Sequence, residues 1–212
     1  MPGFSREIPH GSKEKGRDTC IPPRTGQRAA VHRKPLLDQL AAYQEKHPAE
    51  ADTVARFIHF VESRPECFER SLLDGHVTGS AWIVDSSSTR VLLTHHRKLD
   101  AWLQLGGHAD GDPDVLAVAL KEAEEESGLS DFEPIVEGIF DLDIHPIPER
   151  KGVPEHLHYD VRYVLRANGS TDYVVSEESH DLRWVPLDEV ATLTTDESML
   201  RMVEKWQVKI AG

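Results

Sequence analysis

Three glutamates, Glu122, Glu125 and Glu126, follow one another at the spacing i, i+3, i+4. On an α-helix with 3.6 residues per turn, this spacing puts their carboxylates side by side. Like charges in that arrangement repel by about 0.2–0.5 kcal/mol per pair, so a solvated helix gains nothing from them. A hard divalent cation reverses the sign, because Mg²⁺ and Mn²⁺ prefer clusters of anionic oxygens. The spacing therefore favours a metal site over the alternative, a solvated acidic face.

The segment that must position these glutamates is residues 106–129, which consists of a glycine loop, a helix and a closing glycine. Apolar residues recur at helical spacing between the glycines and predict one buried stripe. Asp112 or Asp114 would cap the helix, with Pro113 tolerated in its first turn. The predicted stripe consists of Leu116, Ala119, Leu120 and Ala123.

This segment resembles the signature of the Nudix hydrolases, which reads Gly, five residues, Glu, seven residues, then Arg-Glu-aliphatic-x-Glu-Glu-x-Gly-aliphatic. Gly107 matches the first glycine, and residues 121–129, Lys-Glu-Ala-Glu-Glu-Glu-Ser-Gly-Leu, match the last part. Two positions depart from the signature, because Pro113 stands in place of the isolated glutamate and Lys121 in place of the arginine. In the family both residues support the loop and the glutamates, so we expect a working site with weaker metal binding.

The resemblance implies a fold class and a reaction. The fold would be α/β, a Nudix-type α/β/α sandwich with a mixed sheet. The reaction would be the metal-dependent hydrolysis of a diphosphate linkage in a nucleoside diphosphate derivative, of nucleotide or nucleotide-sugar type. Because of the two departures, a Nudix-fold nucleotide-binding module with weak or no hydrolysis stays open as the alternative. An isomerase of the same fold would need a cysteine that residues 74–209 lack.

The resemblance also assigns roles to residues. Glu125, Glu126 and the backbone carbonyl of Gly107 would bind Mg²⁺ or Mn²⁺. Glu122 would be a further metal ligand or the base that takes a proton from the attacking water. In some family members a glutamate outside the signature is the base, and Glu178, with Glu177 beside it, is the candidate here. The candidate catalytic residues are therefore Glu122, Glu125 and Glu178.

Other polar residues are candidates for contacts with substrate. His156, His158 and Asp160 alternate along an expected strand, so all three share one face. They would form a substrate-contacting or metal-assisting wall, or simply an exposed polar face, and a zinc site here lacks an identifiable fourth ligand. Arg97 and His108 are the remaining candidates, since both lie close to the glycine loop and could meet a phosphate.

Charge and composition restrict the partners. The 212-residue chain has 24 basic and 37 acidic residues and a net charge of −13. This balance argues against non-specific binding to nucleic acid or to membrane surfaces. We expect a small-molecule nucleotide substrate, whose charge a bound cation neutralises, and no membrane or specific nucleic acid. The absence of a secretory signal, of a long apolar run and of Cys-x-x-Cys pairs predicts a cytoplasmic protein. Whether two chains associate as a homodimer stays open.

Three parts are expected along the chain: a flexible basic tail over residues 1–33, an N-terminal helical extension of two helices over residues 34–73, and a Nudix domain over residues 74–209. Only the last part carries the resemblance. Its flanks, residues 102–107 and 182–189, are similar to the segments that enter and close such domains. Alternating and buried apolar runs predict strands over 79–85, 89–95, 101–105, 132–143, 156–166 and 180–185, and helices over 188–191 and 198–209.

Overall fold

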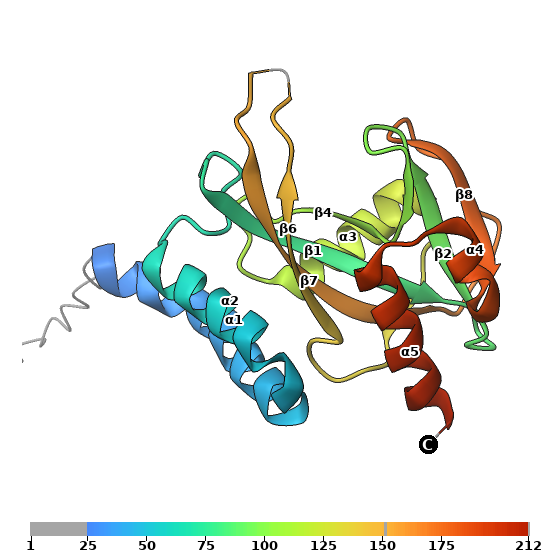
Figure 1. Ribbon diagram of the computed structural model, residues 1–212, viewed down its shortest axis with the longest axis horizontal. Helices are drawn as coiled ribbons and strands as arrows, with labels where there is room; N and C mark the ends of the chain where they lie inside the picture. Colours follow the sequence, from blue (N-terminus) through green and yellow to red (C-terminus); the bar gives the residue numbers. More distant parts are fainter. Residues whose placement is uncertain (1–24, 151, 212) are drawn as a thin grey trace, which may run out of the picture.

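The computed structural model describes residues 25–150 and 152–211 (Figure 1). Two helical segments come first, then a sheet that one long helix interrupts, then short helices and a C-terminal helix. The elements are α1 (Thr25–Lys46), η1 (Pro48–Glu50), α2 (Ala51–Ser63), β1 (Gly75–Val84), β2 (Arg90–His96), β3 (Ala101–Leu103), β4 (Leu105–His108), α3 (Val115–Ser127), β5 (Phe132–Pro134), β6 (Asp141–Ile147), β7 (His156–Ala167), β8 (Ser179–Pro186), η2 (Leu187–Glu189), α4 (Val190–Leu193) and α5 (Glu197–Ala211).

The eight strands form one mixed sheet. Strand β1 is central: it runs parallel to β7 along its whole length and antiparallel to both β2 and β4. Strands β5 and β6 pair antiparallel with β7, and β8 pairs antiparallel with β2. The parallel pairing of β1 with β7 matters most, because it joins segments about 80 residues apart and aligns His76 with His158.

Helices cover both faces of the sheet (Figure 1). One core joins α1, α2 and α3 to the face that carries Val77 and Ala81. The other core joins α4 and α5 to the opposite face, around Trp82 and Trp206. Alternation along β1 explains the division, since consecutive side chains of a strand point to opposite faces. The predicted α/β/α sandwich with a mixed sheet is confirmed.

The N-terminal helices pack directly on this sandwich. The rings of Phe60 and Tyr159 stack with their centroids 3.8 Å apart, and Phe57 meets Tyr159 edge-on. Lys205 of α5 lies 2.6 Å from the hydroxyl of Tyr43. Helix α1 begins at Thr25 and contains Pro35, so it starts earlier than the predicted boundary between tail and extension. Residues 1–24 of the predicted tail lie outside the described residues.

Two predicted strands are divided in the structure. Gln104 separates β3 from β4, and the glycines expected in a loop, Gly106 and Gly107, lie within β4. The predicted strand over 132–143 is interrupted between β5 and β6, where Gly138 adopts a φ of +76°. A left-handed backbone conformation ends strand geometry, and glycine adopts it without steric cost. In the described part of the chain, no helix has the length and apolarity needed to cross a membrane.

Candidate active site

Helix α3 carries the glutamates, and local signals set its ends. The carboxylate of Asp114 accepts a hydrogen bond from the backbone N–H of Ala117 at 3.1 Å, which identifies Asp114 as the N-cap. At the other end Gly128 adopts a φ of +68° and its N–H donates to the carbonyl of Glu124. Pro113 precedes the cap, so it costs the helix no hydrogen bond. The departure at this position therefore leaves the helix intact.

The buried side of α3 differs from the predicted stripe by a small rotation. Leu116 and Leu120 are only partly buried, whereas Glu126 is 7% exposed. The rotation directs one signature glutamate towards the sheet. The residues that α3 buries are Val115, Val118, Ala119, Ala123, Glu126 and Ser127.

Strand β4 passes immediately beside these carboxylates. A Cβ atom on Gly107 would overlap the carboxylate of Glu122, and one on Gly106 would overlap the side chain of Ser80. The N–H of Gly106 donates to Oε2 of Glu126 at 3.3 Å. Close packing against the backbone of Ser80 therefore requires glycine at position 106, and at position 107 a side chain would displace the Glu122 carboxylate.

The electrostatics of the cluster favour a cation. Burial raises the pKa of Glu122 and raises the pKa of Glu126 to about 8, and the neighbouring carboxylates add to both shifts. Lys121 offsets part of this charge, with Nζ 3.6 Å from Glu122 and 3.4 Å from Glu125. One exposed ammonium among three carboxylates leaves a net negative site made of hard oxygen donors. The donor set therefore fits Mg²⁺ or Mn²⁺.

Glu178 lies on the loop that enters β8, and the structure brings it to the same cluster. Its charge contributes to the raised pKa of both Glu122 and Glu126. Lys98 lies 3.6 Å from its carboxylate.

Arg97 binds the backbone of this loop. Its N–H donates to the carbonyl of Glu178, and its guanidinium donates to the carbonyl of Glu177 at 3.0 Å and of Ser179 at 2.7 Å. We predicted that Arg97 contacts substrate, but in the structure its guanidinium donates to the carbonyls of this loop.

Arg70 is a residue that the sequence did not single out. Its guanidinium makes a two-pronged ion pair with the carboxylate of Asp110, which is the main cause of its raised pKa, and the charges of Glu122 and Glu178 contribute further. Arg70 lies before β1, outside the family signature, and no local spacing connects it to α3. Only the fold places this cation beside the glutamates.

The predicted histidines are brought together, but on the other face of the sheet. Gly107 faces α3, so His108, the next residue of β4, points away from α3. His158 is aligned with His76, which the sequence did not single out, and His156 lies next to both. Asp160, on the same face, is buried and accepts hydrogen bonds from Thr78 and Ser80, in addition to those from Gln104 and Arg162.

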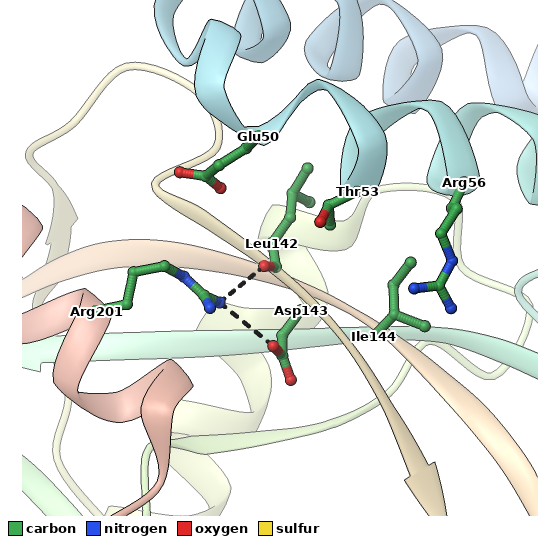
Figure 2. A pocket seen from close by; sticks show the side chains of 7 residues that line it. All are labelled: Glu50, Thr53, Arg56, Leu142, Asp143, Ile144 and Arg201. Atoms are coloured by element: carbon green, nitrogen blue, oxygen red, sulfur yellow. Dashed lines mark hydrogen bonds and ion pairs between the residues drawn. The ribbon is translucent and has the colours of Figure 1, made fainter.

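Two pockets lie away from the glutamates. One, of about 130 Å³, lies between α2, β6 and α5, where Arg201 donates to the carbonyl of Leu142 at 3.0 Å and contacts Asp143 at 3.3 Å (Figure 2). The other, of about 640 Å³, lies between the end of α1, residues 136–140 and α5. Neither pocket is lined by a signature glutamate. The candidate active site is therefore defined by its carboxylate and backbone oxygens and not by either of these pockets.

Comparisons with known proteins identify the family and the fold of this chain. A family model described as NUDIX domain matches residues 75–206. Among solved structures, an Ap4A hydrolase from C. elegans in a binary complex has 18% sequence identity and a TM-score of 0.55, over 64% of this chain and 98% of that chain. The MutT protein from Methanosarcina mazei Go1 has 16% identity and a TM-score of 0.50, over 65% of this chain and 96% of that chain. At these identities the likeness shows the fold alone. No curated protein matches the chain.

Proposed function

The chain belongs to the Nudix family of pyrophosphohydrolases, and we propose that it cleaves a diphosphate linkage in a nucleoside diphosphate derivative with the help of a divalent cation. The observation that carries the proposal is the packing of β4 against α3. This packing places the Glu122 carboxylate where a side chain at position 107 would lie, and the Glu126 carboxylate at the N–H of Gly106.

The cation of this proposal is Mg²⁺ or Mn²⁺. Its ligands would be Glu122, Glu125, Glu126 and the backbone carbonyl of Gly107. Once bound, such an ion neutralises phosphate oxygens and lowers the pKa of a coordinated water. Lys121 keeps the positive charge that the family's arginine supplies, and Nζ reaches two glutamates as a point charge rather than as a planar fork.

The remaining roles follow from position. Glu178 is our candidate for the base that accepts the proton of the attacking water, since its charge acts on both Glu122 and Glu126. Arg97 positions Glu178 through the backbone of the loop. Lys98, beside Glu178, and Arg70, on which the charges of Glu122 and Glu178 act, suit contact with substrate phosphates.

The decisive experiment measures product release from a panel of nucleoside diphosphate derivatives with Mg²⁺ or Mn²⁺. The panel includes nucleotide sugars and a dinucleoside polyphosphate, because one of the similar structures is an Ap4A hydrolase. We expect Glu125→Gln to lower kcat by at least about 100-fold, since a metal ion supplies several kcal/mol of transition-state stabilisation. Glu124→Gln is the matched control, because Glu124 is an exposed neighbour on the same helix.

Two outcomes would contradict this proposal. Unchanged turnover of Glu125→Gln would remove the assigned metal role. Tight binding of one compound without turnover of any would instead support the alternative, a nucleotide-binding module. The departures from the family signature at Pro113 and Lys121 are the reason for this alternative.

A further inference from the structure

We propose that His76, His108 and His158 form a second metal site, selective for a nitrogen-preferring divalent cation such as Zn²⁺, on the face of the sheet opposite α3. Each histidine offers one ring nitrogen, and the three nitrogens lie within 4.8 Å of one another. Three different strands, β1, β4 and β7, supply them. This site is separate from the glutamates, so it does not depend on the proposed hydrolase activity.

Strand pairing holds the three rings in place. His76 and His158 are direct partners in the parallel pair of β1 and β7, and their ring centroids lie 4.9 Å apart. His108 pairs opposite Thr78, the next residue of β1 on the same face as His76. Its ring lies 5.0 Å from that of His76 and 5.1 Å from that of His158. The three rings thus form a triangle whose sides are nearly equal.

Unpaired nitrogens point to a ligand. His76 is 2% exposed, and its Nε2 atom is buried with no hydrogen-bond partner among the described residues. Nε2 of His158 is likewise buried, and it has no hydrogen-bond partner in the described part of the chain. Such atoms are rare in native proteins, because a buried polar group without a partner loses its hydration without compensation. A bound cation would satisfy both lone pairs at once.

The tautomer of His76 suits this role. Its Nδ1 lies 3.5 Å from the carbonyl oxygen of Leu72, so a proton on Nδ1 would be directed at this oxygen and would leave the lone pair on Nε2. A ligating histidine commonly directs its other N–H at a backbone carbonyl, which orients the ring. The 3.5 Å separation is long for a hydrogen bond, and a small movement of the ring towards Leu72 would shorten it.

The donor set selects the ion. Three neutral imidazoles suit Zn²⁺, Co²⁺, Ni²⁺ or Cu²⁺, whereas Mg²⁺ and Ca²⁺ prefer oxygen. Three histidines with water in the fourth position make a known tetrahedral zinc arrangement. His156 lies beside the triad, with Nδ1 bonded to the carbonyl of Pro154 at 2.8 Å, but it is outside the group of converging nitrogens, so a water would take the fourth position. His145, whose Nδ1 bonds Asp143 at 2.9 Å, is also outside the group of converging nitrogens.

The ion would fasten the end of β4 to β1 and β7. His108 directly follows Gly107, the residue that packs against Glu122. A metal bound to His108 would therefore restrain the backbone of Gly107 from the face of the sheet opposite α3. Because the folded chain alone presents the complete triad, Zn²⁺ should also stabilise the fold by mass action.

The test uses full-length protein freed of metal by a chelator and then saturated with Mg²⁺. Calorimetric titration with Zn²⁺ should show one high-affinity equivalent per chain, and Co²⁺ should give the visible absorption of a four-coordinate ion. Each of three variants should weaken Zn²⁺ binding by about 100-fold or more: His76→Gln, His108→Gln and His158→Gln. Loss of a residue that only hydrogen-bonds a metal ligand already lowers metal affinity by about 10–100-fold, so loss of a ligand should cost at least as much. Zn²⁺ should raise the Tm of the wild type and not of His108→Gln.

Two control variants separate this site from the glutamates. His59→Gln removes an exposed histidine of α2 and should bind Zn²⁺ like the wild type. Glu125→Gln should keep the Zn²⁺ equivalent even though it loses turnover. The proposal is overturned if Mg²⁺-saturated wild type binds no Zn²⁺ or Co²⁺. It is equally overturned if Glu125→Gln loses the equivalent while His108→Gln keeps it. His108 is partly exposed, so this variant stays informative if substitution at buried His76 prevents folding.

Discussion

Lys121 shows how a single side chain adapts the family signature. Its ammonium lies between Glu122 and Glu125, and the charge of Glu122 is the main cause of its raised pKa. An arginine here could bind one carboxylate through two parallel hydrogen bonds, whereas lysine acts as a flexible point charge. The lysine preserves the charge balance of the cluster and relaxes its geometry.

The two neighbouring glutamates before β8 allow a matched comparison at the residue scale. If Glu178 accepts the proton of the attacking water, Glu178→Gln should lower kcat by about 10²–10⁴-fold, the usual range for a general base. Glu177→Gln should stay near wild type, because only the backbone carbonyl of Glu177 is used, by Arg97. Steady-state kinetics with Mg²⁺ and the best substrate measure both. Equal losses in the two variants would assign the effect to the loop and not to the carboxylate.

Strand β4 is the element on which both proposed metal sites depend. Consecutive residues of a strand face opposite sides of the sheet, so Gly107 lies against Glu122 while His108 lies with His76 and His158 on the other side. The register with β1 fixes both positions at once, with Gly107 opposite Gly79. A shift of one residue would exchange the two faces and destroy both sites.

Strand β6 is anchored by charge, which gives a pH prediction. Burial alone would raise the pKa of Asp143, but the hydrogen bond to His145 and the charges of Arg162 and Arg201 outweigh it and lower that pKa to about 2, from a usual 3.8. A depressed carboxyl pKa adds stability above about pH 4, which is lost as the pH falls towards 2. Asp143→Asn should therefore cost about 2 kcal/mol at pH 7, and the difference from wild type should shrink steadily below pH 4.

Urea unfolding at a series of pH values measures this difference. The matched control is Asp181→Asn, since the ion pair of Asp181 with Arg183 is exposed and such pairs contribute little. A penalty for Asp143→Asn that does not change between pH 7 and pH 3 would show that packing, not charge, is responsible.

At the scale of the whole molecule, the N-terminal helices belong to the same core as α3. Phe57 is fully buried and meets Tyr159 of β7, and that core continues to Ala119 of α3. Lys205 of α5 adds a polar link, because it bonds Asp141 of β6 and Glu50 of η1 at 2.6 Å each. We therefore expect the two N-terminal helices and the sandwich to unfold together.

Phe57→Ala tests this expectation. Removing a buried phenylalanine should lower the free energy of unfolding by about 3–5 kcal/mol, in a single transition seen by circular dichroism and by tryptophan fluorescence alike. His59→Ala, at an exposed position of the same helix, should change it by less than about 0.5 kcal/mol. Separate transitions for the two probes, with only one affected by Phe57→Ala, would show instead that α1 and α2 fold as an independent unit.

The sequence by itself determined the features that depend on neighbours along the chain. The spacing of Glu122, Glu125 and Glu126 and the terminating Gly128 lie within one helix and its end, whereas the N-cap stayed open between Asp112 and Asp114 until the structure identified Asp114. Their geometry follows from the 3.6-residue period, so the family, the fold class and the acidic cluster could be predicted without coordinates.

The tertiary structure alone decided which distant residues meet. Arg70 and Glu178 reach the cluster on α3 from segments before β1 and before β8, and His76 joins His158 through the parallel pairing of β1 with β7. Long-range pairing leaves no local spacing in the sequence, because a strand records only which residues share a face and not which strand lies beside it. For that reason the sequence offered no fourth ligand for a zinc site, and only the register of the sheet placed His76 beside His158.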